Sequence, residues 1–114
     1  MNDDCIFCKI IKKDLPAKIV FEDKEFIVFC DKNPIAKLHL LLVTRTHIES
    51  LQNISNNDSE WLGRMISIIP KLAIDNGCKD GFRIVSNAGI NSGQEVPHLH
   101  FHILGGRDLH RKML

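Results

Sequence analysis

The sequence predicts an α+β fold in which one five-stranded antiparallel sheet is accompanied by one short and one long helix. Five short apolar segments are separated by turn residues, and they do not alternate with helices as βαβ units would. One longer segment repeats its apolar residues at three- and four-residue spacing, as an amphipathic helix does. A length of 114 residues suits one domain, which we expect over residues 1–114 with a short tail at 107–114.

The first expected elements are a short helix and three strands. The helix is expected over residues 5–12, with lysines opposite an apolar side made of Ile6, Phe7, Ile10 and Ile11. Residues 18–22 and 26–30 predict a β-hairpin, because both are rich in apolar residues and flank a charged turn. Residues 38–44 predict a third strand, which is apolar on both faces apart from His39 and should therefore be central.

The long helix is expected after a possible capping box formed by Asn57 and Glu60. Pro70 lies inside the apolar pattern and should kink or split the helix, and Gly77 is a suitable end. The residues that form its apolar stripe are Trp61, Leu62, Met65, Ile66, Ile69, Leu72 and Ala73. We expect this stripe to pack in the core or in a contact between subunits.

Two strands complete the expected sheet, at residues 82–86 and 98–104. In the second, histidines alternate with apolar residues, so His98, His100 and His102 should share one face about 6.6 Å apart. Such a row suits metal binding, or a nucleophilic imidazole flanked by two anion-binding donors. A solvent-facing strand could use any polar residue, so three histidines favour a functional role.

Charge and composition exclude several classes of function. Lys and Arg total 15 against 14 Asp and Glu, a net charge of +1, which argues against a general nucleic-acid or membrane-surface binder. No apolar run approaches the roughly 20 residues of a membrane span. The first residues, Met1-Asn2-Asp3-Asp4, are acidic where a secretory or mitochondrial signal would be basic. We therefore expect a cytoplasmic protein whose four cysteines are reduced or bind metal.

The histidine-rich strand carries a specific resemblance. Residues 98–104 resemble the His-x-His-x-His-x-x signature of the histidine-triad (HIT) family, and residues 105–107 resemble its HINT branch of nucleotide-binding phosphoramidases. The similarity extends nearly from end to end. The further matching segments are Ile6-Phe7 before Lys9-Ile10-Ile11, Pro16-Ala17-Lys18-Ile19, Asp31 with Pro34, His39, and Gly93-Gln94.

This resemblance implies a HIT fold and a homodimer that binds purine nucleoside monophosphates. It implies that His100 attacks the α-phosphorus, that His102 and His98 flank the phosphate, and that His39 faces them from the neighbouring strand. The resulting nucleotidyl-histidine would be hydrolysed by water. Elementary chemistry agrees, since an imidazole with a pKa near 6.5 is largely neutral and nucleophilic at pH 7.

The resemblance also implies a set of nucleotide-binding residues. Asn87 matches an asparagine on the phosphate side, and Asp31 matches an acid that binds the ribose hydroxyls, although its sequence context alone suggests a turn residue. Gly93 and Gln94 belong to a loop rich in small residues and amides that suits phosphate approach. Glu95 stands where many relatives carry a small hydroxyl residue. We expect Glu95 either to orient a cationic amine leaving group or to point away from the site.

A metal site is expected near the N-terminus. Cys5 and Cys8 have the spacing of metal ligands, but one such pair supplies only half of a tetrahedral site. Some members of the family complete it with a histidine after the third strand and the first triad histidine, which implies structural zinc on Cys5, Cys8, His47 and His98. The alternative is two cysteines on a partly buried helix. No cofactor is expected to be required for the chemistry, and Cys30 and Cys78 are expected to be small buried hydrophobes.

The leading hypothesis is a nucleotidyl hydrolase or transferase acting on purine nucleoside phosphoramidates or on acyl or aminoacyl adenylates. Dinucleoside polyphosphate hydrolysis is a variant of the same class. A second hypothesis is a nucleotide-binding or interaction module with negligible turnover. A third is a zinc hydrolase that uses the triad as ligands, but three consecutive imidazoles of one strand face diverge from a single tetrahedral centre.

Overall fold

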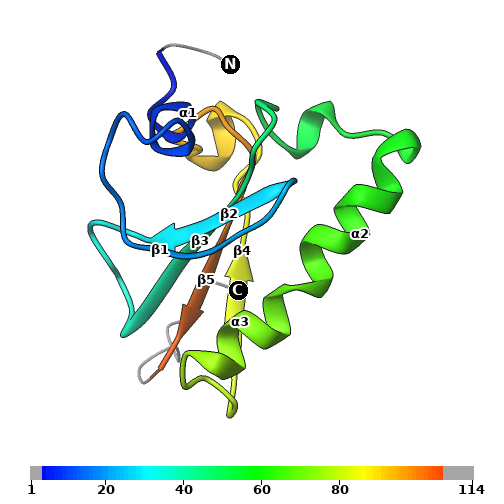
Figure 1. Cartoon of the computed structure of the whole chain (residues 1–114). Coiled ribbons are helices and arrows are strands. Elements are labelled where there is room, and N and C mark those ends of the chain that lie inside the picture. Colours follow the sequence, from blue (N-terminus) through cyan, green and yellow to red (C-terminus); the bar gives the residue numbers. More distant parts are fainter. Residues whose placement is uncertain (1–3, 107–114) are drawn as a thin grey trace.

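A computed structural model describes residues 4–106 and has the expected α+β architecture, with one antiparallel sheet in the strand order β1-β2-β3-β5-β4 (Figure 1). The strands are β1 (Ile19–Glu22), β2 (Phe26–Cys30), β3 (Leu38–Thr44), β4 (Phe82–Val85) and β5 (His100–Gly105). The central position of β3 between β2 and β5 is confirmed. Strand β5 pairs with β3 on one side and with β4 on the other, although these two strands are far apart in the sequence. It carries two of the triad histidines.

Helices cover both faces of this sheet. Figure 1 shows α2 (Ser59–Ser67) and α3 (Ile69–Asp75) running along one face, with α1 (Ile6–Ile11) on the other side. Since neighbouring residues of a strand point to opposite faces, β2 and β3 divide their apolar residues between two clusters. Under α2 and α3 the strand members are Phe26, Val28, Leu40, Leu42, Phe101 and Ile103. Under α1 they are Ile27, Phe29, Leu41 and Val43.

The long helix agrees with its expected form at Pro70 and differs from it at the N-terminal cap. It is split, as expected, because Pro70 lies in the first turn of α3 and cannot donate the backbone hydrogen bond that would continue α2. The expected capping box at Asn57 and Glu60 is wrong. The box is formed two residues earlier by Ser55 and Asp58, which are the N-cap and the third residue of a short 3-10 turn before α2.

Two members of the expected apolar stripes are exposed. Ile6 is 52% exposed and Ile66 is 38% exposed, because each of these short helices buries only the stripe that faces the sheet. The remaining members of both stripes are buried or packed against the core. Cys78 is buried as expected, whereas Cys30 is only partly buried at the end of β2.

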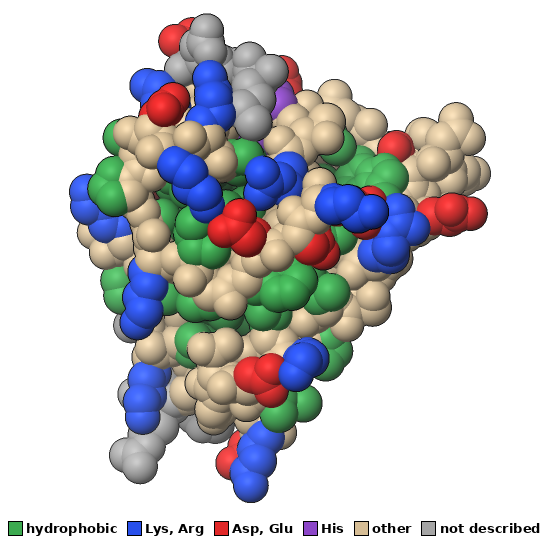
Figure 2. All heavy atoms as spheres, viewed as in Figure 1, with side chains coloured by type: hydrophobic (Ala, Val, Ile, Leu, Met, Phe, Trp, Pro, Cys, Tyr) green, Lys and Arg blue, Asp and Glu red, His purple; other side chains and the backbone are tan. Residues whose placement is uncertain are grey.

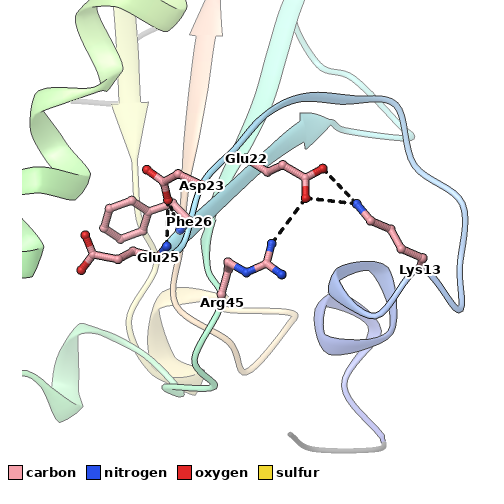
Figure 3. A network of polar contacts seen from close by, with 6 residues as sticks. All are labelled: Lys13, Glu22, Asp23, Glu25, Phe26 and Arg45. Carbon is pink, nitrogen blue, oxygen red and sulfur yellow. Dashed lines mark hydrogen bonds and ion pairs between the residues drawn. The ribbon is translucent and has the colours of Figure 1, made fainter.

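Polar side chains hold the turn between β1 and β2 (Figure 3). Oδ1 of Asp23 accepts hydrogen bonds of 2.8 Å from the backbone N–H groups of residues 25 and 26. Glu22 forms ion pairs with Lys13 at 3.0 Å and with Arg45 at 3.5 Å. All three charged side chains are solvent-accessible, so the ion pairs contribute little to the free energy of unfolding. They connect the end of β1 to the segments that follow α1 and β3.

The surface seen in Figure 2 carries charges of both signs. Lys and Arg side chains lie beside Asp and Glu side chains over this face, instead of forming one continuous patch. A concentrated positive field of the kind that attracts nucleic acid is therefore missing from the face shown. Among residues 4–106, no helix is both long and apolar enough to cross a membrane.

Close packing between β5 and the end of the helical segment gives a prediction about stability. A Cβ atom built on Gly105 would overlap Sγ of the buried Cys78 and lie 2.9 Å from its Cβ. We therefore expect Gly105→Ala to lower the free energy of unfolding by about 1–3 kcal/mol, measured by urea denaturation. Cys78→Ala in the same chain should recover part of this loss. The matched control is Gly63→Ala in α2, which meets nothing within 4 Å and should stabilise by up to about 1 kcal/mol. Equal stability of the Gly105→Ala variant and the wild type would contradict the packing argument.

Candidate active site

A large cleft opens on the face of the sheet that α1 covers. Its volume is about 1270 Å³, and one wall is apolar, formed by Ile6, Phe7 and Ile10 of α1 together with Leu15 and Ile35. The polar residues predicted from the sequence that line it are Asp31, His39, Asn87, Gly93, Glu95, His100 and His102. An apolar wall with a few convergent polar groups is typical of a small-molecule site.

His100 is the first residue of β5, and its contacts determine which ring nitrogen carries a proton. Nδ1 lies 2.6 Å from the carbonyl oxygen of His98, which can only accept, so Nδ1–H is the donor. In the neutral ring Nε2 therefore keeps its lone pair. The ring is 6% exposed, and burial lowers the pKa of His100 despite the opposing effect of the hydrogen bond to His98. A neutral imidazole with one unprotonated nitrogen is the form that can act as a nucleophile.

His102 and His39 form a second hydrogen-bonded pair, at 2.9 Å between Nδ1 of His102 and Nε2 of His39. The backbone N–H of Ile35 donates to Nδ1 of His39 at 3.1 Å. Nδ1 of His39 is therefore an acceptor, and the proton of the neutral ring lies on Nε2, from which it is donated to His102. It follows that neutral His102 carries its own proton on Nε2.

Asp31 stabilises a turn and also lines the cleft. Oδ1 accepts a 2.7 Å hydrogen bond from the backbone N–H of Asn33, which confirms the turn interpretation. Oδ2 lies 3.3 Å from Nε2 of His39, and the side chain lines the cleft. A carboxylate in the cleft wall is compatible with ribose binding, which stays a prediction.

The loop before β5 contributes unequally to the cleft. Asn87, Gly93 and Glu95 line it, but Gln94 is not among its lining residues. The side-chain amide of Gln94 instead ties the loop together, accepting from Gly89 N–H at 2.8 Å and donating to the carbonyls of Glu49 at 2.7 Å and Val96 at 3.0 Å. The structure thus gives Gln94 a role in shaping the loop instead of a contact in the cleft.

His98 lies apart from the other two triad histidines. The expected strand over residues 98–104 is wrong at its start, because the chain bends at residues 96–98 and β5 begins at His100. The fully buried ring of His98 donates from Nε2 to the carbonyl oxygen of Thr44 at 2.7 Å. Its Nδ1 lone pair therefore faces Cys5 and Cys8, and His98 is not among the residues lining the cleft.

The ligand atoms of Cys5, Cys8, His47 and His98 all lie within 4.8 Å of one another. Nδ1 of His98 is 3.2 Å from Sγ of Cys5 and 3.7 Å from Sγ of Cys8, and Nδ1 of His47 is 3.4 Å from Sγ of Cys8. These distances fit a tetrahedral zinc site, whose S···N edges are about 3.5 Å for ordinary Zn–S and Zn–N bonds. Burial lowers the pKa of His98 to about 4, which keeps the ring neutral as a metal ligand must be. The donor set therefore fits a structural zinc ion.

A second group of potential ligands, Asp31, His39 and His102, is equally compact but does not fit a metal. Nε2 of His39 would have to bind the ion, yet the Ile35 N–H at Nδ1 keeps the proton of the neutral ring on Nε2. Moving that proton to Nδ1 would place two donors 3.1 Å apart. This group is better described as a chain of hydrogen bonds.

Several groups at the site were not predicted from the sequence. The ring of Phe7 packs edge-to-face against His100, with centroids 5.0 Å apart and planes at 89°. The other missed groups belong to the backbone: the N–H of Ile35 and the carbonyl of Thr44. Backbone groups carry no signal in the residue type, whereas the apolar pattern of the first helix did mark Phe7 as buried.

Comparisons with known proteins agree with this arrangement. The model of the family described as "Scavenger mRNA decapping enzyme C-term binding" matches residues 4–113. Protein HitA of Neisseria gonorrhoeae is 47% identical over 90% of this chain and 96% of its own length. The purine nucleoside phosphoramidase of Escherichia coli is 38% identical over 96% of this chain and 92% of its own.

Solved structures give the same result for the fold. A HIT family hydrolase from Clostridium thermocellum has a TM-score of 0.94 and 38% identity, with 100% of both chains covered. A histidine triad protein from Clostridium difficile has a TM-score of 0.90 and 40% identity, with 96% of each chain covered. The similarity therefore includes the whole sheet and the helices on both of its faces.

Proposed function

Because the chain belongs to the histidine-triad family of nucleotide hydrolases, we propose that it cleaves phosphoramidates or mixed anhydrides of purine nucleoside monophosphates through a nucleotide bound covalently to His100. The observation that carries this proposal is the 2.6 Å hydrogen bond from Nδ1–H of His100 to the carbonyl of His98, which leaves Nε2 as a nucleophile in the cleft. The E. coli relative named purine nucleoside phosphoramidase supports the substrate class.

The proposed reaction has two steps. The lone pair of His100 Nε2 forms a bond to the α-phosphorus while the bond from phosphorus to the leaving amine breaks, and the amine takes up a proton from water. Water then attacks the nucleotidyl-histidine, so that nucleoside monophosphate is released and His100 is regenerated. The negative charge of the transition state is stabilised by fixed donors at the cleft, for which His102 Nε2–H is the candidate.

The other cleft residues are assigned by their chemistry. We place the purine base against the apolar wall, the ribose hydroxyls at Asp31 and the phosphate near Asn87 and Gly93. The Gly93 backbone has a φ of +85°, a conformation that glycine adopts without strain, and a residue without a side chain lets a ligand come close to the backbone.

Glu95 is the residue through which we propose selection of the leaving group. It is exposed and lines the cleft, where its carboxylate suits a cationic amine. We expect Glu95→Gln to reduce kcat/KM for a lysine-derived phosphoramidate by about 2- to 5-fold, as for an exposed ion pair, and to leave an uncharged-amine analogue unaffected. Steady-state kinetics on the two substrates measure this difference. Equal losses on both would remove the proposal.

Three further properties complete the proposal. Structural zinc would be held by Cys5, Cys8, His47 and His98, and no cofactor would take part in the reaction. A homodimer is supported by the edge strand β4, where Phe82 is 38% exposed and Ile84 is 41% exposed. A single domain over the whole chain is supported by the family match to residues 4–113, and the cytoplasm is its proposed location.

The proposed function is tested by trapping the intermediate. The protein is mixed with an adenosine phosphoramidate, quenched at controlled pH and analysed by peptide mass spectrometry. We expect an adenylate on His100 that forms and disappears at rates consistent with turnover. Turnover that chelators abolish, without an adduct, would instead support a zinc hydrolase. Nucleotide binding without turnover would support a binding module, and faster cleavage of a dinucleoside polyphosphate would change the substrate class.

A further inference from the structure

We propose that Ser86 is a positioning residue, whose hydroxyl group ties the backbone of His100 to the loop that carries Asn87. Oγ of the half-buried Ser86 donates a hydrogen bond of 2.7 Å to the carbonyl oxygen of His100. Ser86 is not among the residues that line the cleft, so it acts through its neighbours and not on the substrate. The catalytic meaning of this contact rests on the proposed function, whereas the hydrogen bond itself does not.

The hydrogen bond lies where the pairing between β4 and β5 ends. The last pair of these neighbouring strands (Figure 1) is Val85 with His102. In the same register Asn87 would face His100, but β4 ends at Val85 and the chain leaves the sheet. His100 is the first residue of β5 and pairs with β3 on its other side. The side chain of Ser86 therefore holds the backbone of His100 on the side that β4 has left.

Two hydrogen bonds then fix His100 at different points. Nδ1–H of its ring donates to the carbonyl oxygen of His98 at 2.6 Å, and its own carbonyl oxygen accepts from Ser86. The first bond sets the direction in which Nε2 points, and the second holds the backbone from which the ring extends. A serine hydroxyl has one proton to donate, so this donor is committed to His100.

The same contact also fixes the start of the loop before β5. Asn87 directly follows Ser86, and Asn87 and Gly93 are the cleft residues near which we place the phosphate. In-line attack requires the nucleophile and the phosphorus to lie about 3–3.5 Å apart with aligned orbitals. A hydrogen bond between Ser86 and His100 therefore sets the nucleophile and the phosphate-binding loop in a fixed relation to each other.

The experiment replaces Ser86 with threonine, valine and alanine. Threonine and valine are both β-branched and similar in size, but only threonine has a hydroxyl group that can donate. The matched control is Ser67→Ala, because Oγ of Ser67 also donates to a backbone carbonyl, that of Arg64 at 3.0 Å, on an exposed part of α2. Far-ultraviolet circular dichroism shows that each variant is folded. If Ser86→Val does not fold, Ser86→Cys takes its place, since a thiol is only a weak donor.

Three measurements separate the hydrogen bond, the chemical step and substrate binding. The carbon-13 chemical shift of the His100 carbonyl reports the hydrogen bond. The rate at which the adenylate forms on His100 in a single turnover of an adenosine phosphoramidate reports the chemical step. Isothermal titration calorimetry with adenosine monophosphate reports the Kd of the cleft.

We expect Ser86→Val and Ser86→Ala to shift the His100 carbonyl resonance and to slow adenylate formation by about 10-fold, with the Kd changed by less than about 2-fold. This loss is smaller than the roughly 100-fold that a misplacement of 1 Å can cause, because only one of the two hydrogen bonds of His100 is removed. Ser86→Thr should keep the resonance and most of the rate. Ser67→Ala should equal the wild type in all three measurements.

An unchanged His100 carbonyl resonance in Ser86→Val, or equal rates of adenylate formation in Ser86→Thr and Ser86→Val, would overturn the proposal. So would a loss of adenosine monophosphate binding as large as the loss of rate, because Ser86 would then maintain the cleft as a whole and not the attack. If the wild type forms no adenylate on His100, the proposed function fails, while the carbonyl resonance still reports the hydrogen bond.

Discussion

Replacing His100 with alanine is expected to reduce turnover of an adenosine phosphoramidate by roughly 10³-fold or more, because the substitution removes the atom that forms the covalent intermediate. The adenylate adduct should disappear at the same time. Binding of adenosine monophosphate, measured by isothermal titration calorimetry, should persist, since the apolar wall and Asp31 are untouched. Loss of both binding and turnover would indicate a collapsed cleft and would not support nucleophilic attack.

The matched comparison is His102→Ala, which removes a neighbouring imidazole from the same strand. His102 is assigned a donor role, and loss of one such donor costs about 10²- to 10³-fold in kcat. We therefore expect the adduct on His100 to form more slowly in His102→Ala, but still to form. An adduct that persists in His100→Ala, on His102 or on another residue, would show that the nucleophile has been assigned wrongly.

The fold was predictable to the extent that it depends on periodicity. The continuous apolar runs at residues 26–30 and 38–44 predicted β2 and β3 with correct ends, because a central strand that is buried on both faces is apolar at nearly every position. The start of β5 was not predictable in the same way. His98 continues the alternation of His100 and His102, but the bend at residues 96–98 ends the strand pairing before it. Periodicity reports which residues are apolar and does not report where the backbone leaves the sheet.

The candidate site was predictable in residue types but not in protonation. The resemblance indicated His39, His100 and His102, and all three line the cleft. Their roles depend on the carbonyl of His98 and the N–H of Ile35, which are backbone groups brought into place by the sheet and by the loop before β3. Because backbone groups are the same at nearly every residue, only the folded structure shows which ring nitrogen meets a donor and which meets an acceptor.

Removal of the proposed metal should destabilise the protein strongly. Purified protein is expected to contain one zinc ion per chain, and Cys8→Ala should lose it, since Cys8 Sγ is the ligand atom near both His47 and His98. A ligand that binds only the folded state stabilises it by about 2.7 kcal/mol when present at 100 times its Kd. For a domain of this size about 1 kcal/mol changes Tm by about 4–8 °C, so the loss of metal should lower Tm by more than about 10 °C.

Cys30→Ala is the matched control, because Cys30 is a partly buried cysteine outside the cluster. It should keep the metal, and a chelator should then lower its Tm as much as that of the wild type. In Cys8→Ala the chelator should have little further effect, because the ion is already lost and no second tetrahedral cluster exists among residues 4–106.

Metal-free wild-type protein with reduced cysteines would contradict the zinc assignment. Equal metal loss in both variants would show that the ion is bound elsewhere. The ring of His98 is a proposed zinc ligand, whereas its backbone carbonyl accepts the hydrogen bond from Nδ1–H of His100. If the chelator lowers Tm but the adduct on His100 still forms, the ring binds the metal and the carbonyl keeps its role without it.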